Sequence, residues 1–223
     1  MAHAFRLFAP LVCIALFGAG LLPPAAAQAT EPMTQQQALL ALNHSDPQQR
    51  YEAMSRLAQI GTADAADAVL PRLHDEEPGL RTVALGTVWR MWGRSGDREI
   101  DTLYGDGTAE MKDGNVLEAI RIFSDIISKR PDFAEAWNKR ATLYFMVGEF
   151  DLSMQDCEEV LQRIPKHFGA LAGYAQMLAE RDQPERALEL MERAVDVNPN
   201  MVNADALMND LRRRIETKRK QMV

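Results

Sequence analysis

Three features of the sequence predict an all-α protein built as a solenoid of helical hairpins. Proline recurs at one fixed interval, at Pro131, Pro165 and Pro199. Small and apolar residues recur in the same register between these prolines, as stacked repeats of one hairpin require. After Ala29, no run reads convincingly as a β-strand. We therefore expect helices that bury one continuous core between successive hairpins.

The composition is that of an ordinary globular protein, and it narrows the possible function classes. Of the 223 residues, 47% are hydrophobic and 26% are charged, which is enough for a sizeable core. The net charge of −7 argues against a nucleic-acid-binding role, because phosphate binding needs a basic surface. With only 2 cysteines, neither a disulfide framework nor a cysteine-rich metal site is expected.

Residues 1–29 are expected to be a cleavable signal peptide. Arg6 gives a short positive start, an uncharged apolar run follows from Leu7 to Leu22, and small residues lead to Ala29. The alternative is an uncleaved membrane anchor, but this run is interrupted by Pro10 and is shorter than the about 20 residues that a spanning helix needs. We expect cleavage after Ala29 and, because the layout is typical of bacteria, a periplasmic protein.

Residues 30–96 show a second, shorter period that also predicts helices. An acidic residue followed by proline occurs twice, at Asp46 and Glu77, and an arginine follows each at the same distance, Arg50 or Arg81. This pattern resembles the HEAT-like helical repeat, in which such a turn precedes an arginine-bearing second helix. The resemblance implies two helical hairpins, over residues 34–62 and 63–94. A generic helical cap explains the pattern about equally well.

Residues 97–199 contain three units of equal length, and the middle unit is the clearest. Its first helix carries Trp137, Ala141 and Tyr144, a turn follows at Gly148, and Pro165 ends the second helix. Equivalent positions in the three units are small or apolar: Gly107, Ala141 and Ala175; Ala119, Ser153 and Ala187; Phe123, Cys157 and Met191; Ile126, Val160 and Ala194. This pattern closely resembles the tetratricopeptide repeat (TPR). The resemblance implies a right-handed α-solenoid with units at about 100–131, 134–165 and 168–199.

The first and third units depart from the repeat pattern. Gly105 and Gly107 stand inside the first helix of the first unit, where each glycine costs about 1 kcal/mol relative to alanine. Glu110 stands there in place of an aromatic residue, so we expect that helix to be irregular or mobile. In the third unit, Asp182 takes the place of the turn glycine, and Pro184 begins the second helix, where proline is tolerated.

Residues 200–223 are expected to form a capping helix with a basic tail. Leu207, Leu211 and Ile215 form an apolar stripe that would shield the last unit of the stack. Six basic residues gather near the end of this helix: Arg212, Arg213, Arg214, Lys218, Arg219 and Lys220. A solvated helix end that complements the macrodipole is the favoured interpretation. Contact with an anionic membrane surface or an acidic protein is the alternative, and it is the only membrane contact we expect.

We find no catalytic or metal-binding pattern, and we expect neither an enzyme nor a cofactor. The histidines are scattered without metal-ligand spacing, and no phosphate-binding loop is present in the sequence. The acidic, glycine-bearing stretch at 106–114 lacks the alternating oxygen ligands of a calcium loop. Cys157 occupies a core position of its repeat and is expected to be buried and inert.

The TPR resemblance implies that the first helix of each unit lines a groove for a partner. The matching positions are Asp101, Tyr104, Gly105 and Thr108; Glu135, Asn138, Lys139 and Thr142; and Gly169, Ala172, Gly173 and Gln176. Among these we predict a partner-binding groove of Tyr104, Thr108, Asn138, Lys139, Thr142, Ala172, Gly173 and Gln176. The small third-unit residues leave room for a peptide, and Asn138 can donate to and accept from a peptide backbone. The carboxylate clamp found in some TPR proteins is not supported, because Tyr104, Thr108, Gly169 and Gly173 occupy its places.

The function expected from these features is that of a non-enzymatic periplasmic scaffold or adaptor, with a protein or peptide partner in the groove. One alternative is a structural subunit of a cell-envelope assembly that uses the convex face and an exposed pair of tryptophans, Trp89 and Trp92. We expect instead that this pair fills the junction between the HEAT-like segment and the first TPR unit, because aromatic side chains supply large buried area. The other alternative is an enzyme accessory or hydrolase with an unrecognised site.

Overall fold

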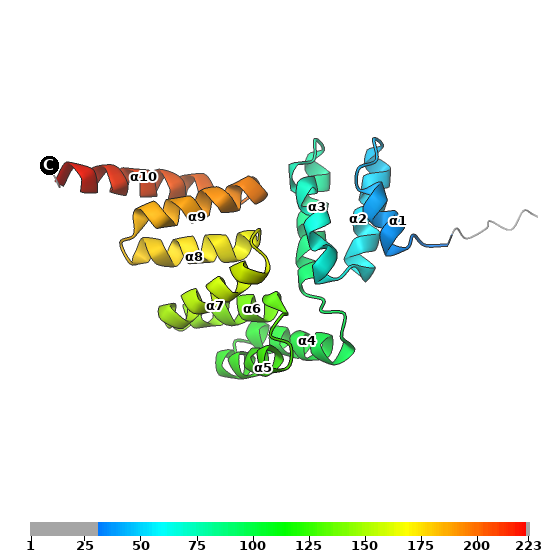
Figure 1. The fold of residues 1–223 in the computed structure, drawn as a ribbon, viewed down its shortest axis with the longest axis horizontal. Coiled ribbons are helices and arrows are strands. Elements are labelled where there is room, and N and C mark those ends of the chain that lie inside the picture. Colours follow the sequence, from blue (N-terminus) through cyan, green and yellow to red (C-terminus); the bar gives the residue numbers. More distant parts are fainter. Residues whose placement is uncertain (1–30, 222–223) are drawn as a thin grey trace, which may run out of the picture. The chain divides into compact units, whose positions relative to one another are not determined.

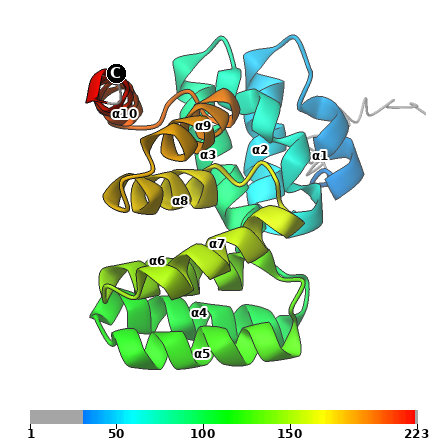
Figure 2. The same ribbon diagram turned by 60° about the vertical axis from the view of Figure 1, so that its left-hand side comes forward.

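The computed structural model describes residues 31–221, and all regular structure within that range is helical (Figure 1). Residues 33–221 belong to one compact unit. Figures 1 and 2 show helical hairpins that follow one another from α4 to α9, with α10 against the last of them. The described residues thus form an all-α solenoid of hairpins, as the repeat pattern predicts. The expected signal peptide, residues 1–29, lies outside the described range.

The first helical hairpin begins where the sequence places capping residues. Helix α1 spans Gln35–Ala41, and its N-cap Thr34 forms a reciprocal capping box with Gln37. Helix α2 spans Pro47–Ile60, with the side chain of Asp46 accepting a hydrogen bond from the backbone of the first turn. The predicted acidic-proline turn therefore marks the start of α2.

The second expected hairpin differs in its first arm. Residues 63–74 form two short 3₁₀-helices, η1 (Ala63–Ala68) and η2 (Leu70–His74), instead of one α-helix. Pro71 explains the break, because its ring nitrogen has no hydrogen to donate to the carbonyl of residue 67. The second arm, α3 (Pro78–Trp92), begins at the predicted proline. A buried bidentate pair, Arg50 with Asp75, ties α2 to the turn before α3 at 2.8 Å.

Three hairpins of similar length follow in the predicted register. Their helices are α4 (Arg98–Asp113) and α5 (Val116–Lys129), α6 (Ala134–Met146) and α7 (Phe150–Arg163), and α8 (Phe168–Glu180) and α9 (Pro184–Val197). The turns inside them place Gly114, Gly148 and Asp182 in the left-handed region, with φ of 82°, 82° and 57°. The residue that replaces glycine in the third unit thus adopts the same turn geometry, which aspartate tolerates better than most residues.

Helix α4 corrects one expectation, because it runs through both of its glycines without interruption. A Cβ atom on Gly107 would lie 3.0 Å from the ring of Phe123 and 3.1 Å from Ile122. The missing side chain is therefore what lets α5 approach α4 closely. The helix-propensity cost at this position is offset by packing, and the predicted irregularity was wrong.

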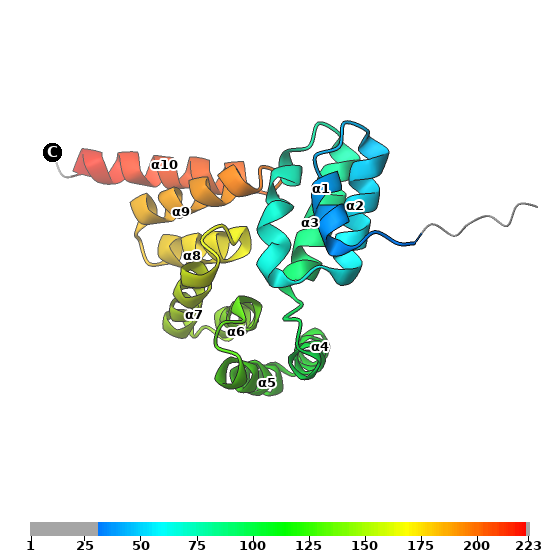
Figure 3. The same ribbon diagram turned by 45° about the vertical axis from the view of Figure 1, so that its right-hand side comes forward.

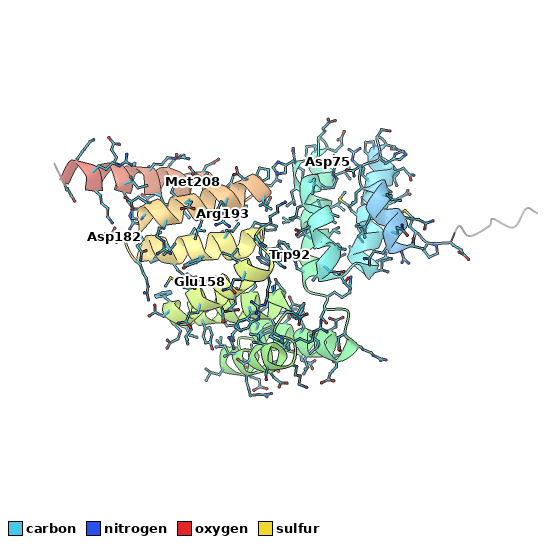
Figure 4. All side chains as sticks on the ribbon, viewed as in Figure 1. Asp75, Trp92, Glu158, Asp182, Arg193 and Met208 are labelled. Atoms are coloured by element: carbon cyan, nitrogen blue, oxygen red, sulfur yellow. The ribbon has the colours of Figure 1, made fainter. Side chains whose placement is uncertain are left out.

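Helix α10 (Ala204–Gln221) covers the last hairpin, burying Ala204, Met208 and Leu211. Basic side chains on α10 have acidic neighbours: Arg212 with Glu192, Arg213 with Asp210, Lys220 with Glu216, and Arg214 and Lys218 with Asp182, which Figure 4 labels near the turn between α8 and α9. This internal pairing favours the solvated helix end over a membrane-binding tail. Of the helices in the described part of the chain, none combines the length and apolar character needed to span a bilayer.

The N-terminal helices pack against the third TPR unit, although the first TPR unit follows them in the chain (Figure 3). Phe168 and Leu171 of α8 share one core with residues of α2 and α3. The side-chain amide of Asn200 donates to the carbonyl of Leu73 at 2.7 Å. Residues 33–97 and the TPR hairpins therefore stabilise each other directly.

Candidate partner-binding groove

The first helices of the second and third TPR units border a cavity of about 170 Å³, which we call the α6–α8 cavity. Its lining residues are Asn138, Ala141, Thr142 and Phe145 of α6, Ser153 and Cys157 of α7, and Gly169, Gly173, Gln176 and Met177 of α8. Four predicted groove residues therefore meet around one space: Asn138, Thr142, Gly173 and Gln176. A Cβ atom on Gly173 would have no neighbour within 4 Å, so the cavity is open at this residue.

The other predicted groove residues lie elsewhere. Tyr104 packs against the rings of Phe123 and Phe133, and its hydroxyl donates to Glu135 at 3.4 Å. Thr108 is exposed and donates to the carbonyl of Tyr104. Ala172 packs into the apolar cores on another side of α8. The repeat register places these residues correctly on their helices, but it does not indicate which neighbours cover them.

Trp89 of α3 packs against Gly169, which is one of the residues that line the cavity. A Cβ atom on Gly169 would lie only 2.7 Å from the Trp89 ring, so the glycine is what permits this contact. The Lys139 ammonium lies 5.7 Å from the centre of the same ring, within the range of a cation–π contact. Lys139 therefore faces α3, and it is absent from the lining of the α6–α8 cavity.

Trp92 completes the contact between α3 and α8. Figure 4 labels Trp92 between α3 and α8. The residue is 1% exposed and stacks on the imidazole of His167, with ring centres 4.0 Å apart. Trp89 is partly buried and meets Phe168 edge-on at 5.2 Å. The pair thus fills a junction, as expected, but the junction is with the third TPR unit instead of the first. These contacts rule out an exposed aromatic anchor built from both rings.

A buried carboxylate, Glu135, organises the polar contacts beside this junction. Its side chain is 1% exposed, and it accepts hydrogen bonds from His167 Nε2 at 3.0 Å and from the Asn138 amide at 3.1 Å. The Lys139 ammonium lies 3.1 Å away. His167 Nδ1 accepts the Ala170 backbone N–H at the start of α8, so the hydrogen that His167 donates must be on Nε2. The neutral imidazole satisfies both contacts.

The surroundings of Glu135 keep it ionised. Burial alone would raise the pKa of this carboxyl, but the hydrogen bond from His167 and the charge of Lys139 outweigh that effect and hold the pKa below its ordinary value. Burial and the nearby Glu135 charge raise the pKa of Tyr104, which therefore remains a donor. Sequence reasoning placed Glu135 in the groove and missed its contact with His167. Glu135 and His167 lie nearly one repeat length apart in the sequence, and this spacing is the feature that could have indicated their contact.

The α6–α8 cavity contains polar groups but no charged side chain. The hydroxyls of Thr142 and Ser153 donate to backbone carbonyls of α6, at 3.0 and 2.7 Å. The Asn138 amide nitrogen donates to Glu135. Burial raises the pKa of Cys157 to about 12, so this thiol is neutral at physiological pH. The donors of Asn138, Thr142 and Ser153 are used inside the fold, which leaves the oxygen of Asn138 and the side-chain amide of Gln176 for a ligand.

Within residues 31–221, histidine, cysteine, aspartate and glutamate side chains form no group of three or more that could hold a metal ion.

Comparisons with solved structures show that the hairpin array shares the fold of TPR domains. The first TPR of Spaghetti (RPAP3), solved with an HSP90 peptide, superposes with a TM-score of 0.51 at 20% identity, over 52% of this chain and 93% of that one. The TPR domain of Sgt2 from Aspergillus fumigatus gives a TM-score of 0.51 at 21% identity, over 56% of this chain and 83% of that one. At this level of identity the comparisons show a shared fold.

Sequence comparisons extend this similarity to a relative of bacterial origin. No family model matches the chain. Anaphase-promoting complex subunit 7 of Dictyostelium discoideum is 25% identical over 92 residues, which are 41% of this chain but only 16% of that protein. A TPR repeat-containing protein of Rhizobium etli is 30% identical over 168 residues, covering 75% of each chain. Together with the register of its three hairpins, this similarity shows that the chain belongs to the TPR repeat family.

Proposed function

We propose that this protein is a non-enzymatic scaffold or adaptor that holds a protein or peptide partner in the α6–α8 cavity. The observation that carries the proposal is the open space between the first helices of adjacent TPR units, lined by Asn138, Thr142, Gly173 and Gln176. Repeat stacks present surfaces of this kind to extended chains. The solved TPR of Spaghetti, which has the same fold, is bound to a peptide.

We further propose that the protein acts in the periplasm. The support is the layout of residues 1–29, with a positive start, an apolar run and small residues before the expected cleavage site. The alternative, a structural subunit of a cell-envelope assembly that uses the convex face and this tryptophan pair, loses its aromatic anchor because both rings pack against α8. The groove therefore remains the favoured surface.

Photo-crosslinking in cells tests the scaffold proposal. A photoreactive amino acid replaces Gln176, which is exposed at the cavity, and in a matched variant it replaces Glu189, which is exposed on α9. We expect a protein adduct from position 176 that mass spectrometry identifies, and none of the same mass from position 189. The adduct should be lost when Gly173→Leu is added. Equal labelling from both positions, or an adduct insensitive to Gly173→Leu, contradicts the proposal.

A further inference from the structure

The chemistry of the α6–α8 cavity indicates what kind of segment it holds. We propose that it takes one uncharged, apolar side chain of leucine or phenylalanine size, from a segment whose backbone N–H groups donate to Asn138 and Gln176. This inference rests on the proposed function, and it adds the chemical class of the partner. The proposed ligand is a side chain together with its flanking backbone, so a free chain terminus is not required for binding.

The size of the cavity sets the size of the side chain. The cavity measures about 170 Å³. An apolar cavity of about 150 Å³ in a protein interior accommodates a benzene molecule. A leucine, methionine or phenylalanine side chain is of this size. The rings and chains of Phe145, Met177 and Ala141 supply the apolar part of the lining, so burying such a group removes apolar surface from water on both partners.

The absence of a free charge in the lining excludes charged side chains. Glu135 and Lys139, the nearest charged pair along α6, are held together at 3.1 Å and do not line the cavity. Cys157 is a neutral thiol. A carboxylate or ammonium placed in the cavity would lose its hydration without gaining an opposite charge, which is costly. An acidic segment is therefore a poor ligand.

The hydrogen-bonding groups favour a backbone that donates. The Asn138 nitrogen is directed to Glu135, and the Thr142 and Ser153 hydroxyls are directed to carbonyls, so their hydrogens are not available to a ligand. The amide oxygens of Asn138 and Gln176 accept no hydrogen bond from residues 31–221. Backbone N–H groups of an extended segment match these oxygens. A terminal carboxylate would meet no positively charged side chain in the lining.

Short capped peptides test this chemistry directly. The probes are acetyl-Ala-Leu-Ala-amide and the matched peptides with Glu or Lys in the centre, titrated into the ¹⁵N-labelled protein while the backbone amide signals of Thr142, Gly169 and Gln176 are followed. Gly173→Leu fills the cavity. Gly105→Leu is the matched control, because Gly105 lies at the equivalent position two repeats earlier, also has open space at its Cβ and lies outside the cavity.

We expect the leucine peptide to shift these signals in the wild type and in Gly105→Leu, and not in Gly173→Leu. The glutamate and lysine peptides should bind at least about tenfold more weakly, because each must bury an unpaired charge. Equal affinity for a charged peptide, or no shift with the leucine peptide, overturns the inference. The crosslinking at position 176 distinguishes the two failures. If the adduct forms while the leucine peptide does not bind, the scaffold function stands and only the selectivity is wrong.

Discussion

Replacing Glu135 with glutamine should weaken the fold and change how its stability depends on pH. Glu135→Gln keeps the shape of the side chain and removes its charge. The substitution replaces charge-assisted hydrogen bonds from His167 and Asn138 with weaker ones and places an NH₂ group near donors. Each hydrogen bond to a charged group contributes roughly 1.5–3 kcal/mol, and relief of the burial of a charge offsets part of this loss. We expect a net loss of about 2–4 kcal/mol.

The pH dependence of stability follows from the direction of the pKa shift. The pKa of Glu135 is lower in the folded protein than its ordinary value, so the unfolded chain binds the proton more readily. The ionised carboxyl therefore stabilises the fold above pH of about 4.5, and this contribution is lost as the pH falls towards the lower, folded-state pKa. Glu135→Gln has no such group and should lose less stability over that range.

Urea unfolding followed by circular dichroism at a series of pH values from 7 to 3 measures both effects. The matched control is Glu189→Gln, which removes an exposed carboxyl from α9. We expect the control to follow the wild type, while Glu135→Gln is less stable at pH 7 and converges towards the wild type at low pH. A Glu135→Gln curve parallel to that of the wild type from pH 7 to pH 3 would refute the reasoning.

Other contacts of the fold, and the first residues of the chain, lead to four more expectations. Gly169→Ala should destabilise the protein by about 1–3 kcal/mol in urea unfolding, because its Cβ would lie 2.7 Å from the Trp89 ring; an unchanged midpoint contradicts this. Cys157 should react with iodoacetamide at pH 7.5 only at the rate of unfolding, since burial raises its pKa to about 12; fast labelling of the folded protein would show that the thiol is accessible. Trp137→Ala should cost about 3 kcal/mol in the same assay, the low end for a core tryptophan, because the ring is half-buried between two guanidinium groups about 5 Å away; a loss below about 1 kcal/mol counts against this packing. Mass spectrometry of the exported protein should give a chain that starts at Thr30, and an intact N-terminus argues against the periplasmic location.

The repeat register could be predicted because the two helices of each hairpin pack together in the same way. Positions such as Ala119, Ser153 and Ala187 must be small where two helices touch, and the structure buries all three. The turn at Asp182 followed from the same register. These are contacts within a hairpin or between neighbours, and a fixed spacing reveals them.

Contacts between distant segments could not be found in this way. Trp92 and His167 come from different kinds of repeat, and no shared period relates a residue of α3 to one at the start of α8. The α6–α8 cavity therefore brings together Asn138, Thr142, Gly173 and Gln176 of the predicted groove, but the residues covered by α3 could not be identified from the sequence. The two 3₁₀-helices were missed because the period shared by Asp46 and Glu77 says nothing about whether Pro71 interrupts a helix.

The contact of α2 and α3 with α8 changes how this array should unfold. In a linear array each repeat touches only its neighbours, so stability is close to a sum of local terms and the end repeats fray first. Here the helices that precede the first TPR unit share a core with the third, and the chain between them is closed into a long loop. Unfolding of any of the enclosed hairpins would disrupt the core that α2 and α3 share with α8. The described part of the chain should therefore open in one transition, with neither end of the TPR hairpins free to peel away alone.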